Sequence, residues 1–171
     1  METRSNVITF KGNPLTLVGP ALAAGDDAPN ATLVGNDLQP VVLSSFRGQR
    51  AIVSVVPSLD TPVCDVQTRR FNQEATALGD DVAVLTVSCD LPFAQARWCG
   101  AAGAERVVTL SDYRDGAFGK AWGLFIEELA LLTRAVFVVD AAGKIAYAQI
   151  VPEVTDEPDY QAALDALRAL A

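Results

Sequence analysis

One cysteine lies where a buried strand gives way to a helix. Residues 51–56 form a short β-branched run, which is typical of a strand covered on both faces in a parallel sheet. Pro57 ends this run because proline cannot donate a backbone hydrogen bond to a sheet. Thr61 and Pro62 then fit the N-cap and the first position of a helix, so Cys64 falls in its first turn.

This position suits a reactive thiol. The first turn of a helix favours an anion, because its backbone N–H groups are unpaired and the helix dipole is positive there. Cys64 is therefore expected to ionise more readily than a free thiol, and Thr61 could turn its hydroxyl towards Cys64 or a substrate oxygen. Alternatively, Cys64 is a small buried hydrophobe that shares a core-facing stripe with Phe71 and Ala75. Both interpretations stay open on this segment alone.

The complete absence of histidine narrows the chemistry. It excludes Ser-His-Asp and Cys-His hydrolases and most zinc and iron sites, whereas a thiolate that is already ionised needs no imidazole base. The three cysteines, Cys64, Cys89 and Cys99, form no Cys-x-x-Cys pair and cannot complete a four-ligand zinc site. We therefore expect redox chemistry with neither a metal nor a cofactor.

Composition bounds the class of protein. With 171 residues, 50% of them hydrophobic and 20% charged, the chain is predicted to form a single domain over residues 1–171. A net charge of -8 argues against binding to nucleic acid or to an anionic membrane surface. The apolar runs are too short to span a bilayer, and residues 1–6 lack the apolar core of a signal peptide. A cytoplasmic location is therefore expected.

The order of predicted elements is that of an α/β protein. A strand at 51–56, a helix from Pro62 to Gly79 and a strand at 82–87 make a βαβ unit, which puts Cys64 at the carboxyl end of a parallel strand. The other expected elements are a β-hairpin within residues 1–18, strands at 32–34, 41–43 and 107–110, a helical turn at 44–48, helices at 90–99 (capped by Asp90, with stops at Gly100 and Gly103), 113–122 and 158–170, and a hairpin over 135–150. This order predicts a thioredoxin-like fold with an N-terminal extension.

Several motifs resemble those of the peroxiredoxin family. The spacing Pro57-x-x-x-Thr61-x-x-Cys64 resembles the peroxiredoxin signature, and the full run PSLDTPVC is similar to that of its thiol peroxidase branch. The likeness continues at 90–100, 133–140 and 157–160, and the run FKGNP at 10–14 also fits. The resemblance therefore covers essentially the whole chain and implies a thioredoxin-like fold of the peroxiredoxin type.

The resemblance also implies roles for five residues. Cys64 matches the peroxidatic cysteine, which attacks the O–O bond of a hydroperoxide and becomes a sulfenic acid. Cys99 matches the resolving cysteine, which would form an intramolecular disulfide with Cys64 that thioredoxin reduces. Thr61 and Pro57 match residues that shape the pocket, and Arg134 matches the arginine that holds the thiolate and peroxide oxygens. The family resemblance further implies a homodimer that acts on hydrogen peroxide and organic hydroperoxides.

Some expectations go beyond this assignment. Cys89 stands where the family usually has an apolar residue, so packing at a strand end is favoured over a redox role. The apolar segment 124–132 could line a groove that favours alkyl or lipid hydroperoxides. Cys64 and Cys99 lie at opposite kinds of helix end, and a disulfide needs Cα atoms within about 7 Å. Local unfolding around both cysteines is therefore expected between the reduced and oxidised states.

Two other functions remain possible on the sequence alone. A disulfide reductase of thioredoxin type would use the same fold, although it normally needs a Cys-x-x-Cys pair that this chain lacks. A non-enzymatic redox sensor would oxidise Cys64 only to change a binding surface.

Overall fold

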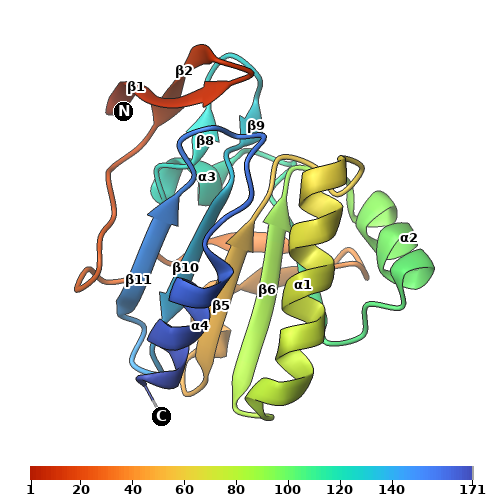
Figure 1. Ribbon diagram of the computed structural model, residues 1–171. Coiled ribbons are helices and arrows are strands. Elements are labelled where there is room, and N and C mark those ends of the chain that lie inside the picture. Colours follow the sequence, from red (N-terminus) through yellow and green to blue (C-terminus); the bar gives the residue numbers. More distant parts are fainter. Residues whose placement is uncertain (171) are drawn as a thin grey trace.

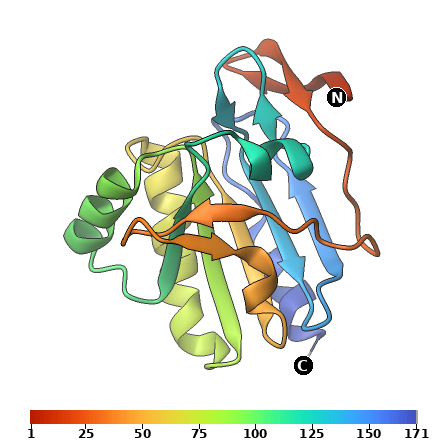
Figure 2. The same ribbon diagram turned by 180° about the vertical axis from the view of Figure 1, so that it is seen from behind.

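The computed structural model describes residues 1–170, apart from the side chain of Thr76, and shows two β-sheets with four α-helices in this part of the chain (Figures 1 and 2). The domain boundary predicted at residue 171 lies outside the described residues. Within them, no helix is both long and apolar enough to cross a membrane.

The larger sheet has seven strands in the order β11-β10-β5-β6-β7-β3-β4. Its strands are β3 (Thr32–Val34), β4 (Pro40–Val42), β5 (Arg50–Val55), β6 (Val82–Ser88), β7 (Val107–Ser111), β10 (Ala135–Val139) and β11 (Ile145–Ile150). β5, β6 and β7 pair in parallel, and β10 pairs antiparallel with both β5 and β11. The carboxyl ends of the three parallel strands therefore meet at one edge, as the predicted βαβ unit requires.

The helices cover this sheet unequally. They are α1 (Pro62–Leu78), α2 (Pro92–Ala102), α3 (Ala117–Ala121) and α4 (Tyr160–Arg168), together with the 3₁₀ turn η1 (Leu43–Phe46). α1 and α4 lie on one face and α3 lies on the other. The β3–β4 hairpin continues the sheet beyond β7 and also crosses the α3 face (Figures 1 and 2). α1 begins at Pro62 and ends before Gly79, as predicted, and Gly79 has a positive φ of 91° that suits glycine.

A second, smaller sheet has the order β1-β2-β8-β9 and lies at the end where β5 and β6 finish (Figure 1). Its strands are β1 (Thr3–Phe10), β2 (Asn13–Val18), β8 (Phe125–Ile126) and β9 (Leu131–Leu132). The predicted N-terminal hairpin is thus confirmed. In the segment 124–132, Leu124, Ile126 and Leu132 are fully buried in the cores and cannot line the predicted groove. Phe125 and Leu131 are partly buried and Leu129 is exposed, so for these side chains the groove stays a prediction.

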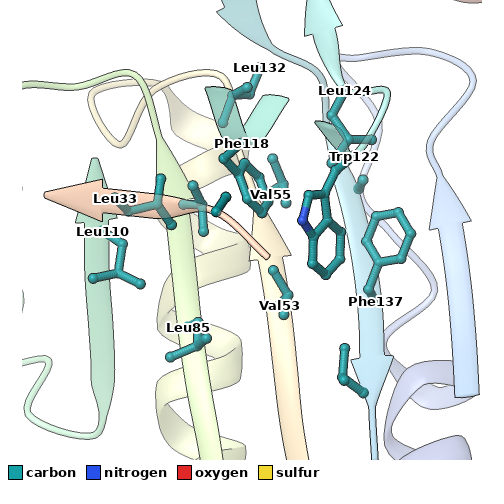
Figure 3. Packing of buried hydrophobic residues seen from close by; sticks show 14 of the residues in the cluster. Leu33, Val53, Val55, Leu85, Leu110, Phe118, Trp122, Leu124, Leu132 and Phe137 are labelled. Atoms are coloured by element: carbon teal, nitrogen blue, oxygen red, sulfur yellow. The ribbon is translucent and has the colours of Figure 1, made fainter. Parts of the chain in front are cut away.

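Side chains of β5 alternate between two cores, as the two-residue repeat of a strand dictates. Val53 and Val55 face the cluster around Trp122, whose ring lies 5.0 Å from those of Phe118 and Phe137 between centroids (Figure 3). Ile52 faces the opposite cluster, which holds α1 and α4 against the sheet. The sheet is therefore covered on both faces, which explains the continuous apolar run of its central strand.

The predicted helix over 113–122 is wrong in its first half, since α3 spans only Ala117–Ala121. Gly116 takes a left-handed conformation with φ of 64°, which cannot continue a helix. The buried carboxylate of Asp112 accepts hydrogen bonds from the backbone N–H groups of Phe118 and Gly119, at 3.0 and 2.8 Å. These bonds fix the start of α3 after the turn rather than within it.

Candidate active site

Cys64 is the third residue of α1 and is fully buried. Its Sγ accepts a hydrogen bond from Nη2 of Arg134 at 3.3 Å, although the two residues lie 70 positions apart in the chain. Phe71 and Ala75 belong to the same buried cluster as Cys64. The thiol is therefore both part of a core-facing stripe and in contact with a guanidinium, so it meets the conditions of both sequence interpretations.

Arg134 directly precedes β10 and is only 2% exposed. Its Nε donates to the carbonyl oxygen of Val154 at 2.8 Å, and its Nη1 donates to Oε1 of Gln67 at 2.8 Å. The Gln67 amide in turn donates to Oγ of Ser54, at 2.8 Å, on β5. The plane of the guanidinium is thus fixed from two sides before it reaches Cys64.

The charge on Arg134 has no carboxylate counter-ion among the described residues. None of the ion pairs in that part of the chain includes Arg134. A buried guanidinium without a negative partner is energetically costly. A thiolate at Cys64 would supply that partner, since the sulfur is the atom to which Nη2 donates.

The loop before α1 carries the other two predicted site residues. Pro57 is half-buried and follows β5, and Thr61 is the exposed N-cap residue of α1. The Thr61 hydroxyl donates to the carbonyl oxygen of Ser58 at 2.9 Å and makes no capping hydrogen bond. No hydrogen bond joins this hydroxyl to Cys64 among the described residues, and the alternative expectation, that it meets a substrate oxygen, stays a prediction.

Asp90, just after the carboxyl end of β6, holds the loop before α1 in place. Its carboxylate accepts hydrogen bonds from Ser58 Oγ at 2.7 Å, from Leu59 N at 2.8 Å and from Ser88 Oγ at 2.8 Å. The prediction that Asp90 caps α2 is wrong, since the N-cap residue is Leu91 and makes no side-chain cap. The carboxylate instead ties the residues before α1 to the carboxyl end of β6.

Cys99 lies in the last turn of α2 and is half-buried, as its predicted position requires. Its Sγ is 3.5 Å from Oγ1 of Thr109 on β7 and packs against the cluster that contains Cys64. Its neighbour Trp98 donates from Nε1 to Oδ1 of Asp65 at 2.9 Å, which joins α2 to the first turn of α1. Cys64 and Cys99 are both free thiols in this structure, each with its own partner.

Gln67 and Ser54 were not identified as site residues from the sequence, but each carries a local signal. Gln67 lies three positions after Cys64 and therefore on the same side of α1. Ser54 is a hydroxyl residue within an otherwise apolar strand, and both side chains are fully buried. A buried polar residue needs a hydrogen-bond partner, so the two positions indicated that partners exist but not which residues they are.

Cys89 follows β6 and is half-buried. Burial, with the nearby carboxylates of Asp112 and Asp90, raises the pKa of its thiol to about 12. At neutral pH the thiol therefore stays protonated, and the protonated form is the unreactive one. This environment suits the packing role expected from the sequence.

In a Cys64→Ser, Cys99→Ser double variant, Cys89 is expected to resist iodoacetamide at neutral pH while the protein is folded. Unfolding removes the burial and the neighbouring carboxylates, so the same thiol should be labelled readily in denaturant, which serves as the control. Mass spectrometry of the labelled peptide measures both rates. Rapid labelling of folded protein at neutral pH would contradict the raised pKa.

The chain is similar to known proteins over most of its length. A family model described as Redoxin matches residues 23–164. The thiol peroxidase of Halalkalibacterium halodurans is 57% identical over 162 residues, which cover 95% of this chain and 97% of the relative. The thiol peroxidase of Bacillus subtilis is 55% identical over 163 residues, with the same two coverages.

Solved structures agree with this likeness. A peroxiredoxin-like protein from Aquifex aeolicus superposes with a TM-score of 0.91 at 41% identity, covering 98% of each chain. A thiol peroxidase from Chromobacterium violaceum superposes with a TM-score of 0.84 at 21% identity, covering 95% of each chain, and at that identity it supports the fold alone. The predicted thioredoxin-like fold of the peroxiredoxin type is confirmed. The chain therefore belongs to the redoxin family and, within it, to the thiol peroxidase branch of the peroxiredoxins.

Proposed function

We propose that this enzyme, a thiol peroxidase by its relatives, reduces hydrogen peroxide and organic hydroperoxides through Cys64, with Cys99 as the resolving thiol and thioredoxin as the reductant. One observation carries the proposal. The buried Arg134 directs a guanidinium N–H at Cys64 Sγ and has no carboxylate partner among the described residues, so a thiolate there completes the charge balance. The proposal includes a homodimer, as the family resemblance implies.

In the first step, the Cys64 thiolate attacks one peroxide oxygen. The O–O bond breaks and its electron pair leaves with the other oxygen. That oxygen takes a proton from solvent, in place of the one that the thiol released on ionisation, to give water or an alcohol. Cys64 becomes a sulfenic acid. Three of the five guanidinium N–H groups of Arg134 are used by Val154, Gln67 and Cys64, so two remain to bind the peroxide oxygens and stabilise the developing charge.

Thr61 and Pro57 would complete the peroxide site at the amino end of α1. Thr61 is exposed and its hydroxyl donates to the Ser58 carbonyl, so the lone pairs of its oxygen are free to accept a hydrogen bond from the peroxide. Pro57 presents no N–H group that would compete for the substrate, and it holds the loop at the strand end.

In the second step, the Cys99 sulfur attacks the sulfenic sulfur of Cys64. An S–S bond forms and the sulfenic oxygen leaves as water. A thioredoxin dithiol then reduces this disulfide by exchange, which returns both cysteines to thiols and leaves the reductant oxidised. The cycle consumes one peroxide and two electrons, and it requires Cys99 to leave its position beside Thr109.

The test treats the reduced protein with one equivalent of cumene hydroperoxide and maps its disulfides by mass spectrometry of peptides. We expect Cys64 and Cys99 to be linked within one chain while Cys89 stays free. A Cys64→Ser variant should consume no peroxide, and circular dichroism serves as the control for its fold. A Cys64 that stops at sulfenic or sulfinic acid, or that pairs with Cys89, would contradict the proposed resolving role.

A further inference from the structure

The carbonyl of Val154, which orients Arg134, belongs to the irregular segment 151–156 after β11. This segment lies against the N-terminal hairpin. The backbone N–H of Thr9 donates to the carbonyl of Pro152 at 2.7 Å, and the N–H of Val154 donates to the carbonyl of Thr9 at 2.9 Å. The position of a carbonyl in the site therefore depends on a hairpin that starts at the other end of the chain.

The Glu153 carboxylate accepts most of the side-chain hydrogen bonds of this segment. Its Oε2 accepts from Thr9 Oγ1 at 2.7 Å and from Gly12 N at 3.0 Å. Its Oε1 accepts from Lys11 N at 2.9 Å, and from Thr155 N and Oγ1 at 3.1 and 2.7 Å. One carboxylate thus joins the turn of the hairpin to the residues on either side of the Val154 carbonyl.

The hairpin turn is shaped to hold an anion. Lys11 and Gly12 both have positive φ, of 50° and 80°, so their consecutive N–H groups point to the same side. Hydrogen bonds from Gly12, Thr155 and Thr9 hold the pKa of the Glu153 carboxyl well below its usual range. The carboxylate is consequently charged at any pH at which the enzyme would work.

We propose that Glu153 is a positioning residue for Arg134, and that the N-terminal hairpin acts through it on the peroxide site. The path runs from the hairpin turn to the Glu153 carboxylate, then through the Val154 carbonyl to Nε of Arg134 and its Nη2 on Cys64. The proposal rests on the proposed function of Arg134 and Cys64. It gives the hairpin a role in catalysis in addition to its packing.

Packing alone would leave the segment less well defined. The Val154 side chain is buried against Ile8, Leu17 and Ile126, which fixes its depth. Its carbonyl can still rotate with the peptide plane that it shares with Thr155, unless the hydrogen bond from Thr155 N to the Glu153 carboxylate holds that plane. Because the Arg134 guanidinium must contact both the sulfur and a peroxide oxygen, a small rotation of that carbonyl moves the guanidinium away from the reacting atoms.

The first test compares Glu153→Gln with Glu128→Gln. Glu128 accepts from Thr16 N with both oxygens at 3.0 Å and so holds the same hairpin, but it has no hydrogen bond to Arg134 or to segment 151–156. We expect Glu153→Gln to lower the single-turnover rate of Cys64 with hydrogen peroxide about tenfold, and Glu128→Gln to change it by less than about twofold. Equal losses in both variants would overturn the proposal.

A double-mutant cycle separates positioning from general loosening. In an Arg134→Gln background there is no fork to position, so Glu153→Gln should cause no further loss beyond about twofold. A further tenfold loss in that background would show that Glu153 does not act through Arg134. If Arg134→Gln fails to fold, the rate at which iodoacetamide alkylates Cys64 in the Glu153→Gln single variant distinguishes positioning from general loosening. Positioning predicts a slower peroxide reaction without faster alkylation, whereas faster alkylation would mean that the buried thiol has become exposed and would overturn the proposal.

The wild-type protein separates this inference from the proposed function. If wild type does not oxidise Cys64 with peroxide, the proposed function fails and the positioning role fails with it. If wild type reacts and Glu153→Gln reacts equally fast, only the positioning role is wrong.

Discussion

Replacement of Arg134 by glutamine is expected to slow the reaction of Cys64 with hydroperoxide by about a hundredfold to a thousandfold, the usual loss when one donor to a developing oxyanion is removed. The residue is buried, donates to Cys64 Sγ at 3.3 Å and is held by Val154 and Gln67. Its loss removes both the positive charge beside the sulfur and the N–H groups available to the leaving oxygen. Single-turnover kinetics of the reduced protein measure the effect.

Arg134→Lys distinguishes the charge from the geometry of the fork. A lysine keeps the positive charge but cannot donate in the plane of the three present partners, so it should recover only part of the rate. Arg70→Gln is the matched control, because Arg70 is half-exposed on α1 and pairs with Glu74. That variant should stay within about twofold of wild type, since exposed ion pairs contribute little. Wild-type rates in folded Arg134→Gln would contradict the role.

The βαβ unit around Cys64 could be predicted because each of its boundaries follows a local rule. Pro57 cannot continue a sheet, Pro62 fits the first turn of a helix, and Gly79 takes the positive φ that ends it. These rules need only neighbouring residues. They were therefore enough to place Cys64 in the first turn and at the carboxyl end of a parallel strand.

The contacts that complete the site could not be predicted in the same way. Arg134 meets Cys64 across 70 residues, and no local pattern pairs them. It was identified only through the family resemblance. For Asp90 a local rule gave a wrong prediction. The rule made Asp90 the N-cap residue of α2, whereas its carboxylate accepts hydrogen bonds from Ser58 and Leu59. A capping residue and a residue that fixes a distant loop have the same sequence signature, and only tertiary contacts separate them.

Replacement of Cys99 by serine is expected to abolish turnover with thioredoxin while the first reaction of Cys64 with peroxide continues. Without Cys99 the remaining thiol of the chain is that of Cys89, which stays protonated at neutral pH, so the sulfenic acid has no reactive partner in the same chain and overoxidation becomes the next step. Steady-state peroxide consumption with thioredoxin measures the loss, and a single-turnover assay measures the reaction that remains. Cys89→Ser is the matched control and should keep turning over, because its thiol stays protonated at neutral pH. Full turnover by Cys99→Ser would contradict the resolving role.

The same role requires α2 to open. Cys99 is held near Thr109, and Trp98 binds Asp65 in the first turn of α1, so the two thiols face different partners while both helices are intact. α2 ends at Ala102 with Gly103 as its C-cap, so Cys99 lies close to a helix end that can open locally while the sheet stays in place. Structures of the reduced and oxidised protein should therefore differ in backbone at 61–66 and 95–101. Superimposable backbones there would mean that the disulfide forms without unfolding, against the geometry that a disulfide demands.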